Sequence, residues 1–402
     1  MDGGAFDIQP IGRFYGANTT IRRPKEITCF SYDDEHKFHL GDSSLRYYYT
    51  PRLPADLNRG FDTFQKLDDT ADEHLDALLE TIMALEKETE KRCEADIITW
   101  RGMMTKILTA PFDNLNGFEM NATCFQGTIF IEENNAYKNQ QKQIQQNQRM
   151  PPGMASQDLM AYWGYKFETL CLLQQPWDPT PRAEIESREA LVVNNNAQYC
   201  SVVRTGIGSS RLIIGGEVDA GMLSPLYMHA SGDFRGRVKA CADAGVLVWD
   251  CKPDRKEDPI NWVELKTSAE IRNDRDMIKY ERKLLKFWAQ SFLLGVPKII
   301  VGFRDNHGIV HRLEELETAS IPNKVKKLGR GTWDGNICIN FAAAFLESNN
   351  GLKGLKSTIK EGGTWRIRKL EKSSLIQVFK VEETGTGDII STSFLDWRSR
   401  SW

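Results

Sequence analysis

Hydrophobic residues recur along this chain with two different periods, which predicts helices and strands mixed from one end to the other. Helical spacings of three and four residues are clearest after position 74 and between positions 274 and 294. Short runs of β-branched and aliphatic residues, bounded by Gly, Pro or Asn, predict strands. Because no repeat period is visible, this mixture favours one α/β or α+β domain built on a central sheet.

Helices are expected where apolar residues follow the helical period. Thr70–Glu73 is a capping box that opens a helix running to about Lys91. Ser156 is expected to cap another helix, which runs to about Leu173. Three further helices are expected over Met103–Ala110, Asp274–Leu294 and Trp333–Ser348.

The strands are expected over eight segments, the last of which contains two: Ile97–Arg101, Thr123–Glu132, Gln198–Arg204, Arg211–Ala220, Val246–Asp250, Trp262–Thr267, Lys298–Phe303 and Thr364–Glu383. Residues 1–60, rich in Pro, Gly and aromatics, predict an extended N-terminal arm around the core. Residues 134–152 are Gln- and Asn-rich and lack a core pattern, which predicts a surface loop or a weakly helical insertion. Residues 1–402 are therefore expected to form a single domain.

Composition limits the classes of partner and site. Of 402 residues, 41% are hydrophobic and 27% are charged, as in ordinary soluble enzymes. The net charge of −3 means that any nucleic-acid surface must be a local basic patch. The eight cysteines stand singly, without metal-binding spacings, which argues against a zinc site and favours a reducing compartment. We see no signal-peptide pattern and no membrane-spanning run, so we expect a soluble, intracellular protein.

Two predicted strands, Arg211–Ala220 and Asn261–Ser268, carry the candidate chemistry. Side chains two apart on a strand share a face, so Glu217 is paired with Asp219, and Glu264 with Lys266. If the strands are neighbours, three carboxylates and one ammonium converge. Crowded carboxylates repel one another unless a cation is present, and Mg²⁺ or Mn²⁺ prefers oxygen ligands. This is the Asp…Glu-x-Lys arrangement of metal-dependent nucleases. The alternative is two half-exposed strands with charges on a solvated face.

Four other features have a functional and an ordinary interpretation. Arg46, among tyrosines, can pack in a stack or meet a phosphate, and Arg101 at a strand–helix turn can fork onto a phosphate or carboxylate. Gly164 lies one helical turn from Glu168, which indicates tight helix packing or the approach of a ligand. The helix over 274–294 carries a polar stripe that can track a phosphate backbone or simply be solvated. Its members are Lys279, Lys283, Lys286 and Gln290.

Taken together and in order, these motifs resemble the DXO family of RNA 5′-end decapping enzymes, which includes the fungal Rai-type proteins. The likeness covers about residues 25–350. The motifs that carry it are Leu45-Arg-Tyr-Tyr48, Trp100-Arg-Gly102, Gly164-Tyr-Lys-Phe-Glu168, Gly216-Glu-Val-Asp219, Glu264-Leu-Lys266, Trp288-Ala-Gln-Ser291 and Gly302-Phe-Arg304.

The resemblance implies a role for each matching residue. Glu168, Asp219, Glu264 and the backbone carbonyl of Leu265 would bind a divalent metal, Mg²⁺ or Mn²⁺, with Glu217 in the same cluster. Lys266 and Gln290 would contact the scissile phosphate. The remaining residues would line the RNA or cap-side channel: Arg46, Trp100, Arg101, Gly102 and Cys200.

The resemblance also implies a fold, an activity and a partner. The fold would be α+β, with two mixed, twisted β-sheets packed together, flanked by helices, and a pocket between them. The activity would be metal-dependent hydrolysis of RNA 5′ ends in RNA quality control, removing a triphosphate as pyrophosphate, an incomplete cap or an NAD cap. Compact fungal members are nuclear and pair with the Rat-type 5′→3′ exoribonuclease, which they stimulate.

Several alternatives stay open at this point. Within the family, they are a solitary DXO-type decapping exoribonuclease and a non-catalytic stabilising subunit of an exoribonuclease. Outside it, they are a restriction-like DNA nuclease and a triphosphate-tunnel phosphatase, although the latter needs acidic pairs on several strands. A partner surface is expected in Gly221–Phe234, unless its apolar residues pack on the core: Met222, Leu223, Leu226 and Tyr227.

Overall fold

The computed structural model describes residues 3–16, 19–147, 153–221, 261–347 and 354–401. Its larger sheet is mixed and ten-stranded. In spatial order its strands are β1 (Gly3–Asp7), β17 (Leu375–Glu382), β16 (Thr364–Lys369), β7 (Phe118–Phe125), β8 (Thr128–Glu133), β6 (Ile97–Trp100), β11 (Ser210–Glu217), β10 (Gln198–Ile207), β2 (Ile21–Tyr32) and β3 (Phe38–Leu40).

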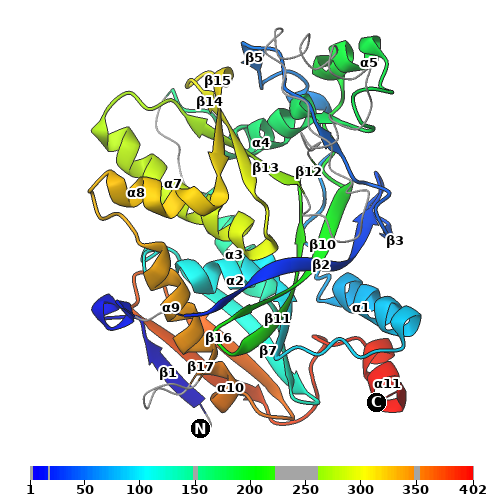
Figure 1. Cartoon of the computed structure of the whole chain (residues 1–402), viewed down its shortest axis with the longest axis vertical. Helices are drawn as coiled ribbons and strands as arrows, with labels where there is room; N and C mark the ends of the chain where they lie inside the picture. Colours follow the sequence, from blue (N-terminus) through cyan, green and yellow to red (C-terminus); the bar gives the residue numbers. More distant parts are fainter. Residues whose placement is uncertain (1–2, 17–18, 148–152, 222–260, 348–353, 402) are drawn as a thin grey trace, which may run out of the picture.

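The smaller sheet is also mixed and has seven strands. In spatial order they are β5 (Ala55–Asp56), β15 (Ile309–Glu317), β14 (Lys298–Arg304), β13 (Trp262–Ala269), β12 (Ala220–Gly221), β4 (Tyr47–Tyr48) and β9 (Leu172–Leu173). In Figure 1 this sheet lies above the ten-stranded one.

The helices join and cover the two sheets. They are α1 (Asp76–Thr89), α2 (Arg101–Thr109), α3 (Asn135–Gln146), α4 (Gln157–Cys171), α5 (Arg182–Ser187), α7 (Asp274–Leu294), α8 (Ile321–Lys327), α9 (Gly335–Leu346), α10 (Leu355–Thr358) and α11 (Thr392–Ser401). Short 3-10 turns lie at Ile11–Phe14, Phe61–Thr63, Arg188–Ala190 and Thr318–Ser320.

Three apolar clusters hold these layers together. The largest lies between the sheets, where α2, α7 and α9 pack together with strands of both. A second cluster packs α1 and α11 on the outer face of the ten-stranded sheet, and these helices lie side by side in Figure 1. A third packs α4 on the outer face of β13 and β14. The expected α+β fold of two mixed sheets flanked by helices is therefore confirmed.

Local sequence explains where the two helices nearest the site begin and end. The side chain of Ser156 accepts a hydrogen bond from the Leu159 N–H and so caps α4, as expected. Asn273 caps α7 in the same way through the Asp276 N–H. Gly295 follows α7 with φ of 76°, a conformation that glycine adopts without strain.

The start of α1 differs from the expectation. The Thr70 hydroxyl donates to the Asp68 carboxylate at 2.6 Å, so it does not cap a helix. Residues 70–74 form an irregular turn in which His74 has a positive φ of 49°. The helix therefore begins at Asp76, and the predicted capping box Thr70–Glu73 is wrong.

Two other expectations near the ten-stranded sheet have different outcomes. The single strand over Thr123–Glu132 is wrong, because Gln126 and Gly127 turn with positive φ and make β7 and β8 a hairpin. For residues 134–152 the helical alternative is confirmed and the loop alternative is not, since α3 occupies most of them and the Asn134 side chain caps it. Gln is a good helix former, which favours helix where no apolar period is present.

The N-terminal arm does not merely wrap the core. Its β2 lies inside the ten-stranded sheet between β10 and β3, and its β4 pairs with β12 in the smaller sheet. The expected strand Val246–Asp250 lies outside the described residues, as does the proposed partner surface beyond Gly221. No helix in the described part of the chain is long and apolar enough to cross a membrane.

Candidate active site

The two acidic stretches meet where the chain passes from one sheet to the other. Arg211–Ala220 is not one strand, as expected, because β11 ends at Glu217 in the ten-stranded sheet. After Val218 and Asp219, β12 pairs Ala220 with Val263 of β13 in the other sheet. The two stretches are thus neighbours only over β12, and this crossing places Glu217 and Asp219 beside β13.

Hydrogen bonds fix Asp219 and Lys266 around β13. The carboxylate of Asp219 accepts the Leu265 N–H at 2.6 Å, which holds the crossing segment against β13. The Lys266 ammonium lies 2.7 Å from the Glu264 carboxylate and 3.7 Å from that of Asp219. The predicted Asp…Glu-x-Lys juxtaposition is therefore present in the structure.

Arg101 completes the charge arrangement from α2. Its guanidinium lies 3.2 Å from the fully buried carboxylate of Glu264. Space for this approach comes from β11, because a Cβ on Gly216 would stand 2.8 Å from the Arg101 Cβ. A Cβ on Gly215 would likewise meet the Trp100 ring at 2.9 Å. The Gly-Gly pair before Glu217 thus allows the start of α2 to pack against β11.

The carboxylates of this cluster carry more negative charge than the protein neutralises. Burial and the charge of Asp219 raise the pKa of Glu217 to about 7 and that of Glu168 well above its usual value. Burial and Glu264 raise the pKa of Asp219 to about 6. Although burial opposes it, Lys266 and Arg101 together lower the pKa of Glu264. Crowded, buried oxygen donors with raised pKa values are a donor set that fits a divalent cation.

A cavity of about 340 Å³ opens beside these carboxylates. It is lined by Glu168, Glu217 and Asp219 on one side, and by Arg46 and Tyr199 among others. Carboxamide side chains are frequent in the rest of the lining: Gln65, Gln174, Asn194, Asn195 and Gln198. An acidic cluster, a guanidinium and many amides in one cavity suit a phosphorylated, base-bearing ligand.

Glu168 reaches this cavity from α4, one turn from Gly164. A Cβ on Gly164 would meet nothing within 4 Å, so tight helix packing among the described residues does not explain this glycine. Open space beside Glu168 is consistent with the approach of a ligand.

The other predicted site residues lie at the margins. Cys200 is buried opposite Glu217 in the β10–β11 register, and burial raises the pKa of its thiol. Gln290 is half-buried on α7, a helix that contacts β11 and β13. Gly102 is exposed at the second position of α2. Trp100 points elsewhere: its indole packs on the outer core and does not line the main cavity.

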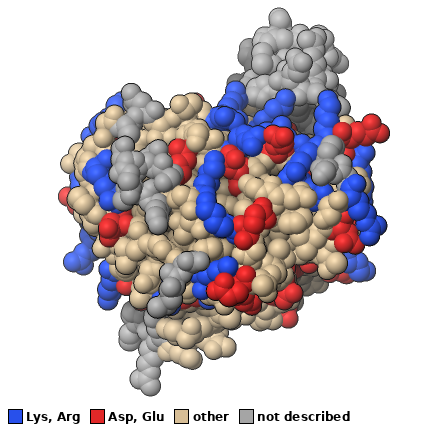
Figure 2. All heavy atoms as spheres, turned by 90° about the horizontal axis from the view of Figure 1, so that it is seen from below, with Lys and Arg blue, Asp and Glu red and all other residues tan. Residues whose placement is uncertain are grey.

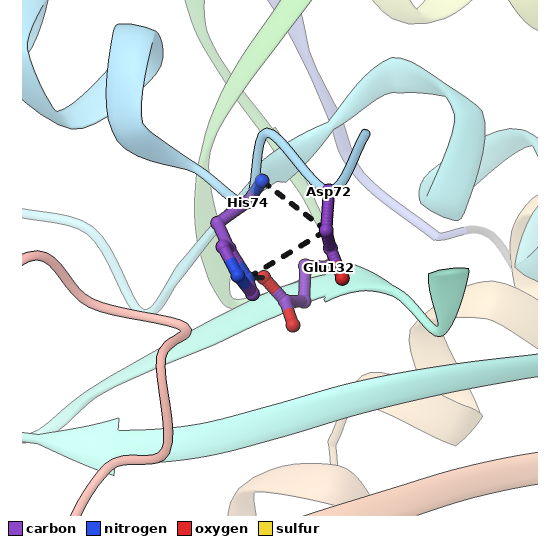
Figure 3. A group of neighbouring side chains, drawn as sticks. All are labelled: Asp72, His74 and Glu132. Atoms are coloured by element: carbon purple, nitrogen blue, oxygen red, sulfur yellow. Dashed lines mark hydrogen bonds and ion pairs between the residues drawn. The ribbon is translucent and has the colours of Figure 1, made fainter. Parts of the chain in front are cut away.

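Trp100 instead contacts a second polar cluster that the sequence did not reveal, formed by Asp72, His74 and Glu132 (Figure 3). The indole N–H donates to the His74 carbonyl at 2.9 Å. His74 Nδ1 lies 2.9 Å from the buried carboxylate of Glu132 and 3.7 Å from Asp72. These three side chains, brought from two segments, lie close enough to hold a metal ion. No motif spans positions 72 and 132, so only the fold brings them together.

We expect His74 to stabilise the loop behind Trp100 in a pH-dependent manner. Burial alone would lower the pKa of His74, but Glu132 and Asp72 raise it overall. A raised histidine pKa contributes stability below about pH 6.5, and this contribution is lost as pH rises through the folded-state value. Burial also raises the pKa of Glu132, which adds to the same trend.

Changing His74 to Asn, which tolerates positive φ but is too short to reach Glu132, should lower the free energy of unfolding by about 1–3 kcal/mol at pH 6. The loss should be smaller at pH 8.5, as measured by urea unfolding at both pH values. His39→Asn is the control, because it breaks an exposed pair with Asp33 and should have little effect. An equal loss at both pH values would mean that His74 acts by packing alone.

Comparison with known proteins places this geometry in a family. Residues 22–395 match the family described as RAI1 like PD-(D/E)XK nuclease. The chain belongs to this nuclease family. It is 87% identical, over all of both chains, to a protein of Aspergillus fumigatus named Decapping nuclease RAI1. The family resemblance found in the sequence is thus confirmed, and the protein is an enzyme.

Two solved structures of this nuclease family share the fold. The crystal structure of Candida albicans Rai1 in complex with pU5-Mn²⁺ has a TM-score of 0.83 at 27% identity and covers all of both chains. Scheffersomyces stipitis Rai1, in complex with (3′-NADP)⁺ and a calcium ion, has a TM-score of 0.78 at 25% identity. It covers 95% of this chain and 97% of its own.

Proposed function

We propose that this nuclease acts on RNA 5′ ends and removes a triphosphate as pyrophosphate, an incomplete cap as an intact unit, or an NAD cap. The observation that carries this proposal is the juxtaposition of Asp219, Glu264 and Lys266 beside a cavity large enough for about one nucleotide-sized group. Relatives solved with pU5-Mn²⁺ and with a nicotinamide dinucleotide support both the polymer and the NAD-type end.

The acidic cluster has the donors for the metal that this chemistry needs. Glu168, Asp219 and Glu264, with the Leu265 carbonyl and Glu217, would hold Mg²⁺ or Mn²⁺. When bound, such a cation activates water and stabilises charge developing on phosphoryl oxygens.

The remaining residues position the substrate and its charge. Asp219 and Glu264 outweigh the effect of burial and raise the pKa of Lys266, so this side chain stays a cation that can face the scissile phosphate. Arg101 forms an ion pair with Glu264 and so holds its carboxylate in place. Arg46 in the cavity offers a guanidinium to a second phosphate of the departing 5′ group. Gln290 would contact the scissile phosphate from α7.

Two observations weigh against the alternatives. A non-catalytic subunit would have no need of four crowded carboxylates, one of them fully buried, with a lysine and an arginine around them, because such clusters are costly without a ligand. A triphosphate-tunnel phosphatase has a different fold from that of the RAI1-like nuclease family, which residues 22–395 match. A solitary decapping exoribonuclease remains the second candidate, since the same site can serve both activities.

The proposal extends to a nuclear protein that pairs with the Rat-type 5′→3′ exoribonuclease. The logic is chemical, because an exonuclease that requires a 5′ monophosphate needs an enzyme that produces one. Co-purification of the two proteins should give a stable complex. Failure to form any complex would favour the solitary exoribonuclease.

RNA and DNA of the same sequence, each carrying a 5′ triphosphate, separate this function from that of a restriction-like nuclease. We expect pyrophosphate release from RNA at least about tenfold faster than from DNA, which corresponds to about 1.4 kcal/mol in barrier height. Internal cleavage of DNA by the purified protein would overturn the proposal.

A further inference from the structure

The polar face of α7 contains one lysine whose surroundings differ from those of its neighbours. Lys279 lies 3.9 Å from Asp276, and Lys286 lies 3.1 Å from Asp113. Lys283, between them, donates instead to the Thr267 carbonyl at 3.3 Å. Among the described residues, no carboxylate forms an ion pair with it.

The contact with Thr267 places this ammonium next to the proposed reaction centre. Thr267 directly follows Lys266 on β13. Lys283 also lies seven residues before Gln290, so the two share one face of α7 about 10 Å apart along its axis. Lys283 therefore shares a face of α7 with Gln290 and contacts the β13 backbone directly after Lys266.

The electrostatic surroundings of Lys283 favour an anion. Although the Lys283 side chain is exposed, desolvation by its surroundings and the charge of Arg304 lower the pKa of its ammonium, and no acidic group opposes them. Arg304 stacks over the Trp163 ring at 4.1 Å, and its Nε is buried without a hydrogen-bond partner. Lys283 and Arg304 repel one another, although Asp305 offsets part of the charge of Arg304, and a bound anion would relieve this repulsion.

An enzyme that acts on the end of a polymer needs an open side for the rest of the chain. Neither Lys266 nor Lys283 lines the cavity that contains Arg46. Net charge cannot supply the attraction, since it is −3. Figure 2 shows basic and acidic side chains interspersed on the face that it presents. Affinity for the RNA body must therefore come from local cations such as Lys283.

We propose that Lys283 binds a backbone phosphate of the RNA body, next to the phosphate held by Lys266 and Gln290. This assignment rests on the proposed function, because it takes the bound polymer to be the substrate of the carboxylate cluster. Lys283 would then contribute to the binding of long RNA more than to the binding of short RNA.

The test compares short and long RNA without hydrolysis. A 5′-triphosphate dinucleotide and a 5′-triphosphate decamer are titrated by fluorescence anisotropy in EDTA, at several salt concentrations. Lys283→Ala should weaken decamer binding about fivefold at low salt and reduce the salt slope by about 0.7, the value expected for one lost single-strand phosphate contact. Dinucleotide binding should change less, and Lys283→Arg should restore decamer binding.

Lys279→Ala and Lys286→Ala are matched controls from the same helix, because each of these lysines already has a carboxylate partner. Both should stay within about twofold of the wild type. Equal losses for the two ligands, or a Lys283→Ala variant that behaves like the controls, would overturn the proposal. So would a wild type that does not bind the decamer. A wild type that binds the decamer but hydrolyses no RNA 5′ end would instead contradict the proposed function, and Lys283 would then bind RNA that is not a substrate of the carboxylate cluster.

Discussion

Replacing Glu217 and Asp219 with Ala together should abolish hydrolysis of 5′-triphosphate RNA, with a loss of at least about 10³-fold in kcat. These carboxylates are the donors whose raised pKa values show that the protein alone does not neutralise them. Their removal therefore relieves repulsion in the metal-free protein. The variant should stay folded, with a thermal midpoint close to that of the wild type in EDTA, because the relief of repulsion offsets the lost hydrogen bond from the Leu265 N–H.

The wild type provides the control for this loss. EDTA should stop its activity, and added Mg²⁺ or Mn²⁺ should restore it, whereas neither ion should restore the double variant. Turnover by the double variant at the wild-type rate would be incompatible with the proposed site. A variant that unfolds would show that Asp219 mainly holds β13 through the Leu265 N–H.

Lys266→Ala should reduce kcat by about 10²-fold or more while changing KM little. The reason is that Lys266 stays protonated between two carboxylates and can meet charge that develops on the phosphate. The fold should persist because Arg101 still pairs with Glu264. Lys266→Arg, which keeps the charge but changes its shape, should recover only part of the rate.

Single-turnover kinetics and equilibrium binding in EDTA separate the two possible roles of this lysine. An unchanged single-turnover rate with weaker RNA binding would make Lys266 a simple substrate anchor.

The chemistry of the site could be predicted from the sequence more readily than its architecture. Glu264 and Lys266 lie two residues apart on a strand. Because side chains alternate between the two faces of a strand, the sequence alone predicts that these two share a face. The passage of Arg211–Ala220 between two sheets could not be predicted, because β12 is only two residues long and carries no pattern. The turn at Gln126 and Gly127 could not be predicted either, because Gln126 takes a positive φ that its residue type does not favour.

Long-range contacts explain what the sequence did not show. Arg101 was expected at a strand–helix turn, but its pairing with Glu264 depends on the space left by Gly216 across two elements. The His74–Glu132 pair joins positions that no local motif connects. In the sequence, Lys283 is indistinguishable from the other lysines of a solvated stripe. In the structure, Lys279 and Lys286 pair with carboxylates, whereas Lys283 donates to a backbone carbonyl.

The most direct test of the central claim is to identify the small product released from one RNA sequence carrying a triphosphate, an unmethylated cap or an NAD end. Chromatography with mass detection, in Mg²⁺ or Mn²⁺, should show at least one of three products: pyrophosphate, an intact cap unit or a released nucleotide group. Each should appear together with RNA that bears a 5′ monophosphate. Release of internal fragments while all three 5′ ends stay intact would contradict the account.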